Sequence, residues 1–147
     1  MLPVFQILLV DDSPEDARLF ETALKEAAPR IKLYWVGTAD EGMEYLNQEK
    51  RFQGTGPVSL VVCDLNLPRI DGLEFLSEVK KNPVYASVPF IVYTSSAYPS
   101  DIQRAYALGA NSYIVKPMTL ETMVSQLRSL VHYWLEVVAL PPPMAPD

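Results

Sequence analysis

Five short apolar runs, separated by segments with helical periodicity, restrict the fold of this chain more than any other feature. The runs are rich in β-branched and aromatic residues, which favours buried strands. We predict strands at Phe5–Val10, Lys32–Val36, Val58–Cys63, Phe90–Thr94 and Ser112–Val115. We predict helices at Pro14–Ala28, Ala39–Gln48, Gly72–Lys81, Ser100–Leu108 and about Leu120–Val138. This alternation predicts βαβ crossovers, and therefore an α/β fold with a doubly wound five-stranded parallel sheet covered on both faces.

Polar residues at the expected helix starts agree with these boundaries. Ser13 before Pro14, together with Asp71, Ser100 and Thr119, can accept the free backbone N–H groups of a first helical turn. We therefore predict that these four side chains cap their helices.

Length and composition favour one domain. The chain has 147 residues and is 49% hydrophobic, enough for a single core, which we place at residues 1–138. The proline-rich end, residues 139–147, is expected to be disordered because proline cannot continue a helix.

The net charge of −6 argues against nucleic acid or an anionic membrane surface as the partner. No apolar stretch approaches the roughly 18 residues of a membrane span. The single cysteine, Cys63, cannot form an internal disulfide and is expected to be a buried small hydrophobe, and no signal-peptide pattern precedes the first strand. These features predict a cytoplasmic protein.

Polar residues follow four of the five predicted strands. Asp11 and Asp12 follow the first, Asp64 follows the third, Thr94 ends the fourth and Lys116 follows the fifth. The carboxyl ends of parallel strands share one edge of the sheet, where ligands bind in open α/β folds. Three carboxylates there would repel by about 4 kcal/mol per pair at ~4 Å. The site therefore needs a cation or a raised pKa.

The donor atoms favour Mg²⁺ at this edge. They are oxygens only, and the single histidine, His132, lies in the last helix and is expected to be an ordinary helix residue. Mg²⁺ commonly takes one or two carboxylates together with water and phosphate oxygens. An Asp carboxylate can attack a phosphoryl group, and the Lys116 ammonium and Thr94 hydroxyl can bind phosphate oxygens. We therefore predict a phosphoryl-transfer site in which Asp64 is the nucleophile.

Four motifs in this order, "LLVDDS", "CDLNLPRIDG", "VYTSS" and "NSYIVKP", resemble the CheY-like receiver domain of bacterial two-component response regulators. The resemblance covers about residues 5 to 130 and implies a flavodoxin-like strand order of 2-1-3-4-5. The "DLNLPR" form and the long last helix are similar to single-domain regulators of bacterial phytochrome kinases.

The resemblance also implies roles for individual residues. Asp64 would be the phosphoacceptor, with a sensor histidine kinase as donor. Asp12 would bind Mg²⁺ directly, Asp11 mainly through a metal-bound water, and Asn66 through its backbone carbonyl. The protein would be a phosphorylated signalling module rather than a classical enzyme.

Three further residues gain roles from the same resemblance. Thr94 would be the switch hydroxyl, Tyr113 the aromatic that changes rotamer with it, and Lys116 the phosphate-binding lysine. The Lys116–Pro117 peptide would be cis.

Other readings remain open. Asp11 and Asp12 could cap a helix, Thr94 could be a plain strand-end residue, and Tyr113 a core aromatic that never switches. A haloacid-dehalogenase-type phosphohydrolase would need a second Asp where this chain has Asn66. A receiver-fold binding module that is never phosphorylated would usually have lost an acid, the Thr or the Lys, and all are present here.

The predicted last helix has more apolar surface than one face can hold. Its main stripe is continuous over about 19 positions, and Tyr133, Val137 and Leu140 lie off it. At ~1.5 Å per residue it would be about 28 Å long, more than a small sheet covers. We expect its tip either to fold onto its own domain or to form a homodimer or partner contact, and we expect the output to be a change in protein contacts.

Overall fold

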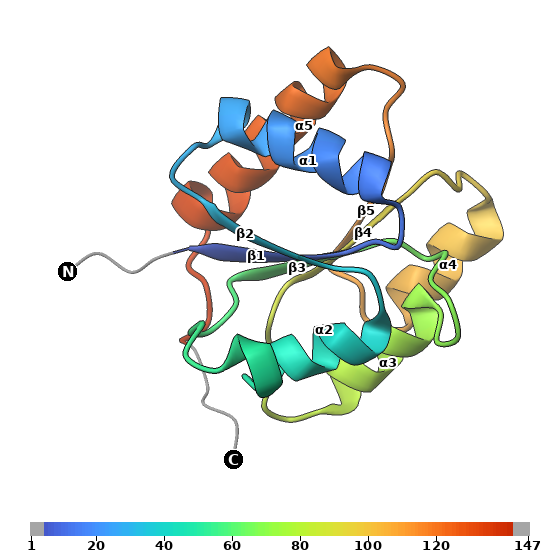
Figure 1. The fold of residues 1–147 in the computed structure, drawn as a ribbon. Coiled ribbons are helices and arrows are strands. Elements are labelled where there is room, and N and C mark those ends of the chain that lie inside the picture. Colours follow the sequence, from blue (N-terminus) through green and yellow to red (C-terminus); the bar gives the residue numbers. More distant parts are fainter. Residues whose placement is uncertain (1–4, 143–147) are drawn as a thin grey trace.

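The computed structural model describes residues 5–142, which form a parallel sheet between two layers of helices (Figure 1). The sheet has five strands in the order β2-β1-β3-β4-β5, and every neighbouring pair is parallel. The strands are β1 Gln6–Val10, β2 Lys32–Val36, β3 Leu60–Cys63, β4 Phe90–Thr94 and β5 Ser112–Val115. The predicted fold class and strand order are confirmed. Only the first and third strands begin later than predicted.

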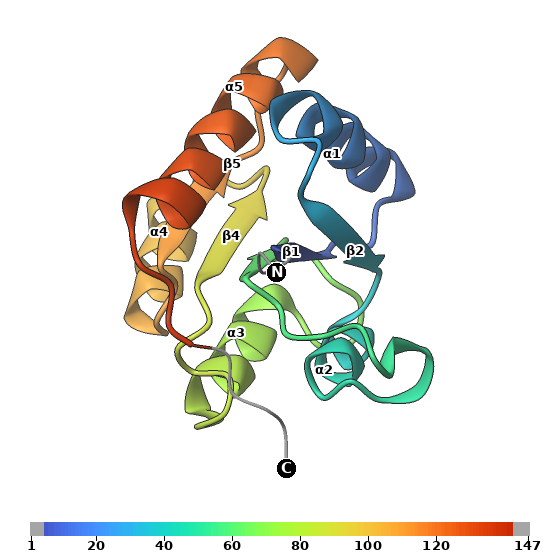
Figure 2. The same cartoon turned by 90° about the vertical axis from the view of Figure 1, so that its left-hand side faces the viewer.

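Helices cover both faces of the sheet. They are α1 Pro14–Ala27, α2 Ala39–Leu46, α3 Gly72–Lys81, α4 Pro99–Ala107 and α5 Leu120–His132, with a short 3₁₀ turn at Lys50–Phe52 before β3. Helices α1 and α5 lie on one face, and α2, α3 and α4 lie on the other (Figures 1 and 2). Each of the first four strands is followed by a helix that carries the chain back to the next parallel strand, as βαβ units require.

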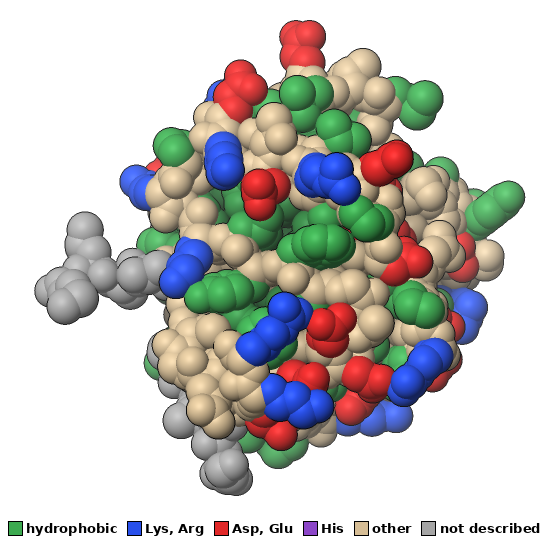
Figure 3. Space-filling model, in the orientation of Figure 1, with side chains coloured by type: hydrophobic (Ala, Val, Ile, Leu, Met, Phe, Trp, Pro, Cys, Tyr) green, Lys and Arg blue, Asp and Glu red, His purple; other side chains and the backbone are tan. Residues whose placement is uncertain are grey.

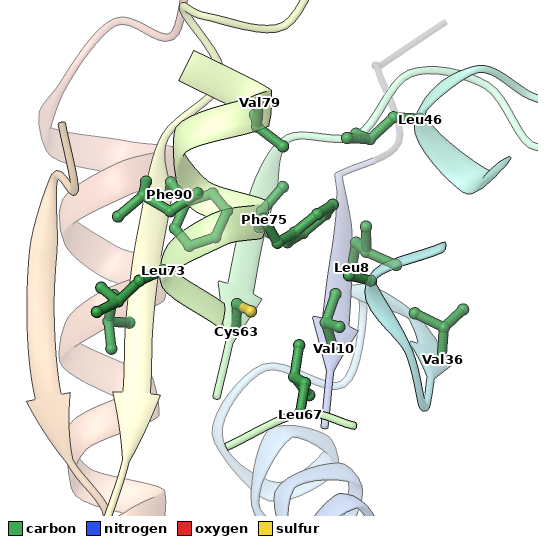
Figure 4. Close-up of a cluster of buried hydrophobic side chains, with 14 of the residues drawn as sticks. Leu8, Val10, Val36, Leu46, Cys63, Leu67, Leu73, Phe75, Val79 and Phe90 are labelled. Atoms are coloured by element: carbon green, nitrogen blue, oxygen red, sulfur yellow. The ribbon is translucent and has the colours of Figure 1, made fainter. Parts of the chain in front are cut away.

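Alternate residues of the central strands supply the two halves of the core. In β1, Leu8 and Val10 pack with the α2 and α3 side, whereas Ile7 and Leu9 pack with the α1 and α5 side. Figure 4 shows the first half, with Leu8 and Val10 on the same side of the sheet as Phe75 of α3. Because both faces are covered, β1, β3 and β4 are buried along their whole length. This double burial explains the unbroken apolar runs.

Three of the four predicted helix caps are present. Ser13, Asp71 and Thr119 each accept a hydrogen bond from the backbone amide three residues ahead. The prediction for Ser100 is wrong, because α4 begins at Pro99, whose fixed φ suits the first helical position, and no side chain caps that helix. Thr38, which was not predicted, caps α2.

The last helix ends earlier than predicted. Helix α5 stops at His132, and the chain makes one wide π-helical turn over Tyr133–Val137 rather than continuing as an α-helix to Val138. The wide turn brings Trp134 and Leu135 against the half of the core that α1 and α5 enclose. The regular α-helix thus ends six residues before the predicted end at Val138.

A small polar cluster connects this turn to the loop that follows α1. Glu136 accepts a hydrogen bond from Arg30 at 3.0 Å and lies 2.7 Å from Nδ1 of His132. The chain then crosses to the edge of the sheet opposite the strand-end acids (Figure 2). There Leu140, Pro141 and Pro142 line an apolar cavity. The rest of the predicted disordered tail, residues 143–147, lies outside the described residues.

Acidic and basic side chains are interspersed on the face shown in Figure 3.

Among residues 5–142, no helix is both long enough and apolar enough to span a bilayer.

Candidate functional site

The strand register brings the predicted acids together. Val10 at the end of β1 pairs with Cys63 at the end of β3, so Asp11 and Asp64 are the next residues on adjacent strands. The Asp64 amide donates to the Val10 carbonyl at 2.9 Å, which continues the ladder by one residue. Both acids are almost fully buried. The structure therefore places two carboxylates side by side at the carboxyl edge of the sheet.

The Lys116 side chain reaches Asp11 and Asp64 from β5, the strand at one side of the sheet. Thr94 pairs with Val115 across β4 and β5, and the Lys116 amide donates to the Thr94 carbonyl at 2.7 Å. The Lys116 ammonium donates to Oδ2 of Asp11 and to Oδ2 of Asp64, both at 2.8 Å. One cation thus neutralises part of the repulsion between the two buried acids.

A third carboxylate completes the surroundings of this ammonium. Asp16, in the first turn of α1, accepts a hydrogen bond from Lys116 at 2.8 Å. Burial alone would lower the pKa of Lys116, but hydrogen bonds to Asp11, Asp16 and Asp64 outweigh burial and raise it. Lys116 therefore stays charged throughout the physiological pH range.

Burial dominates the ionisation of Asp11. Desolvation raises the pKa of this carboxyl group, although the bonds from Lys116 and from the Ser13 amide act in the opposite direction. The Ser13 bond, at 2.9 Å, goes to Oδ1, whereas Lys116 binds Oδ2. The Asp11 carboxylate is thus only partly compensated by its neighbours, so further positive charge near it would be stabilising.

Gly72 fixes the backbone that carries Asp64. Its amide donates to the Leu65 carbonyl at 2.9 Å at the start of α3. A Cβ atom at position 72 would lie 2.1 Å from the Asp64 carbonyl oxygen, so only glycine permits this approach. The glycine in "RIDG" therefore lets α3 pack directly against the residue that follows β3.

Thr94 and Tyr113 meet at the loop after β4. Thr94 is fully buried, and its hydroxyl oxygen lies 3.5 Å from the Ser96 amide. The Tyr113 hydroxyl donates to the Ser96 carbonyl at 2.9 Å, and burial raises the pKa of Tyr113. The two predicted switch residues thus contact the same backbone segment, while their switching role stays a prediction.

Two residues of the site were missed in the sequence. The sequence analysis assigned no role to Asp16 in the first turn of α1 or to Trp35 in β2. The Trp35 indole N–H donates to the Asp11 carbonyl at 2.7 Å, across the β1–β2 pair. The signal for Trp35 was its position at the end of the neighbouring strand, in register with Leu9.

Of the four predicted metal ligands, two are buried and two are exposed at the surface. Asp11 and Asp64 are buried, whereas Asp12 and Asn66 are exposed and line an open pocket beside α3 and α4. The Asn66 amide also donates to Oδ1 of Asp64 at 3.2 Å. Among residues 5–142, no three Asp, Glu, His or Cys side chains are grouped closely enough to hold a metal ion. Lys116 instead supplies the positive charge.

The chemistry of these donors nonetheless fits a hard divalent cation. All of them offer oxygen, and the incomplete compensation of Asp11 favours a second positive charge. The donor atoms at this edge of the sheet therefore suit Mg²⁺.

The predicted cis peptide is absent. No cis peptide bond occurs in the part of the chain that the structure describes, so Lys116–Pro117 is trans and that prediction is wrong. Trans is the intrinsically favoured form, by about 0.5–1 kcal/mol before proline.

Comparisons with known proteins agree with this fold. The family model described as the response regulator receiver domain matches residues 7–128. Response regulator Rcp1 of Synechocystis sp. is 34% identical over 135 residues, covering 92% of each chain.

Two solved structures share the fold over almost the whole chain. The phosphorylated cyanobacterial phytochrome response regulator RcpA superposes with a TM-score of 0.87 at 32% identity, covering 95% of this chain and 100% of that one. The Mn²⁺-bound form of Rcp1 gives 0.82 at 33% identity, covering 94% and 99%.

Proposed function

Because the chain belongs to the response regulator receiver family, we propose that it accepts a phosphoryl group on Asp64 from a sensor histidine kinase. One observation carries this proposal: a buried carboxylate at the carboxyl edge of the sheet is hydrogen-bonded to Lys116 at 2.8 Å, with Asp11 beside it. The similarity to RcpA, whose structure is of a phosphorylated form, supports it.

The proposed step is an in-line displacement at phosphorus. An oxygen of Asp64 forms the new O–P bond while the P–N bond of the donor phosphohistidine breaks, and the electron pair of that bond returns to the imidazole nitrogen. Lys116 offers its charge to the phosphoryl oxygens, and the Thr94 hydroxyl can turn from Ser96 to donate to one of them. The product is an aspartyl phosphate on the protein itself.

The proposed cofactor is Mg²⁺. Asp12 and Asp64, the Asn66 carbonyl and, through water, Asp11 would hold it, and it would neutralise charge on the phosphoryl oxygens. Rcp1, which is similar to this chain, has been solved with Mn²⁺ bound, and that supports a divalent ion here.

We propose that the signal leaves through protein contacts on the face of α4, β5 and α5. Tyr113 lies in β5 and bonds to Ser96 in the loop before α4, so a movement of Thr94 toward a phosphoryl group would disturb this contact. We place the protein in the cytoplasm, where the catalytic domains of sensor kinases operate.

A homodimer through the last helix is also proposed. Tyr133 and Val137 are 49% and 59% exposed, while Trp134 and Leu135 pack on their own domain. The apolar surface available for a second copy is therefore smaller than the sequence suggested. Sedimentation of the wild type and of a Tyr133→Ser, Val137→Ser variant tests this. A monomeric wild type at high concentration, with and without a phosphoryl analogue, would remove the dimer.

The test of the proposed function is direct labelling. Purified protein is incubated with Mg²⁺ and acetyl phosphate, and intact-mass spectra are recorded for wild type, Asp64→Asn and the control Asp71→Asn. Asp71 lies on the same loop and accepts the Glu74 amide as the cap of α3, a role that Asn also fills. Wild type and control should gain one phosphoryl group and Asp64→Asn none. Equal labelling of all three proteins would refute the assignment.

A further inference from the structure

The Lys116 ammonium donates hydrogen bonds to three different carboxylates. The acceptors are Asp11, Asp16 and Asp64, all at 2.8 Å. Asp11 and Asp64 belong to the proposed phosphorylation site. Asp16 has no role in the proposed phosphoryl transfer, and its contact with Lys116 joins the first turn of α1 to the end of β5.

The local structure of α1 leaves the Asp16 side chain available for this contact. Asp16 is three residues after the cap Ser13, where an acidic side chain often reaches back to the cap's own amide. Here the Ser13 amide donates to Asp11 instead, at 2.9 Å. The Asp16 carboxylate therefore turns toward Lys116.

Asp16 is also the most exposed of the three partners. Its side chain is 41% exposed, compared with 2% for Asp11 and 9% for Asp64. Water can replace Lys116 at Asp16, whereas separating Lys116 from Asp11 would leave a buried charge without its partner. Among the three bonds, the one to Asp16 is the least costly to open.

A phosphoryl group that binds Lys116 needs one of these three protons. Before the O–P bond forms, Asp64 must stay aligned for attack and Asp11 is buried, so the bond to Asp16 is the least costly one to open. We propose that Asp16 is a positioning residue that acts through Lys116 as a brake. Asp16 holds the Lys116 ammonium on the α1 side and adds a negative charge close to Asp64. Both effects slow the phosphorylation of Asp64. This inference rests on the proposed function.

The rate of Asp64 labelling tests the brake. Single-turnover rate constants with acetyl phosphate at saturating Mg²⁺ are compared for wild type, Asp16→Asn, Asp16→Glu and Glu15→Gln. Glu15 lies in the same helical turn and is exposed, so Glu15→Gln changes the net charge equally without touching Lys116. Asp16→Asn should be faster than wild type by about 3- to 10-fold, as removal of one partly screened charge near a doubly charged donor predicts. Glu15→Gln should stay within about twofold, and Asp16→Glu should restore the slow rate.

A second measurement tests the contact itself without metal or phosphoryl donor. Urea midpoints are measured for Asp16→Asn in the wild-type and in the Lys116→Met background. The substitution should lower the midpoint only where Lys116 is present. Equal shifts in both backgrounds would show that Asp16 and Lys116 are not coupled.

The outcomes separate the two proposals. If wild type is labelled at Asp64 and Asp16→Asn reacts no faster than Glu15→Gln, or more slowly than wild type, the brake is overturned and the proposed function stands. If wild type is not labelled at Asp64, the proposed function fails and the brake fails with it.

Discussion

Replacing Gly72 with alanine tests how the nucleophile is positioned. The new Cβ would lie 2.1 Å from the Asp64 carbonyl oxygen and 2.7 Å from the Leu65 Cα. Real Cβ atoms essentially never approach other heavy atoms closer than 3.0 Å, so the gap to the carbonyl must grow by about 0.9 Å. Both of those neighbours are backbone atoms, and no side chain can rotate away to relieve the overlap. Either α3 or the segment after β3 has to move.

The loss in free energy of unfolding can be worked out from this overlap with the backbone. Overpacking a close contact costs about 1–3 kcal/mol, and a clash with backbone belongs at the upper end. Alanine recovers at most about 1 kcal/mol through its helix propensity. The free energy of unfolding should therefore fall by about 2 kcal/mol. With an m-value of about 2 kcal/mol/M, the urea midpoint should fall by about 1 M.

The matched control is Gly37→Ala. An added Cβ there would meet nothing nearer than the Glu41 carboxylate oxygen at 4.0 Å. Its urea midpoint should stay close to that of wild type or rise slightly. Because Asp64 would shift relative to Lys116, Gly72→Ala should also be labelled more slowly by acetyl phosphate, even under conditions in which it is fully folded. A Gly72→Ala protein with an unchanged midpoint and labelling rate would refute this account of the loop.

Three further predictions concern charge, metal and the chain end. Asp11→Asn should stabilise the metal-free protein at pH 7, because burial raises the Asp11 pKa and the ionised form lowers stability above that pKa. The gain in stability should disappear as the pH falls through the raised pKa toward 3.8. Urea melts that show a pH-independent gain, or no gain, would contradict this. Asp12→Ala should leave the urea midpoint nearly unchanged but weaken Mg²⁺ binding, because the exposed Asp12 is a proposed ligand; an unaltered Mg²⁺ titration would remove it from the ligand set. Truncation after His132 should lower the free energy of unfolding by about 2 kcal/mol, because Trp134 and Leu135 lose their packing; an unchanged denaturation curve would show that the π-turn contributes nothing.

The strands and the acids at their ends were predictable because both are local features of the sequence. A central parallel strand is buried on both faces, so β1, β3 and β4 read as continuous apolar runs. The polar residue after such a run lies at the carboxyl edge wherever the strand pairs. Asp11, Asp64 and Lys116 could therefore be assigned to one edge before any contact between them was known.

The partners of those residues depended on the tertiary structure. Asp16 and Lys116 are separated by 100 positions, and no periodicity in the sequence couples them. Trp35 reaches the Asp11 carbonyl only because β2 pairs with β1 in one particular register. The same limit applies to the close approach of Gly72 to Asp64, which depends on the angle at which α3 leaves the sheet.

The end of α5 shows most clearly what the sequence determines and what the tertiary structure determines. The apolar periodicity of the sequence continues to Val138, and by itself it predicts an α-helix to that residue. In the structure the regular helix stops at His132, and Trp134 and Leu135 of the wider turn that follows pack against the core. The sequence by itself determined which residues are apolar and with what local period. Only the tertiary structure decided which of them reach the core, because that depends on where α1 lies beneath them.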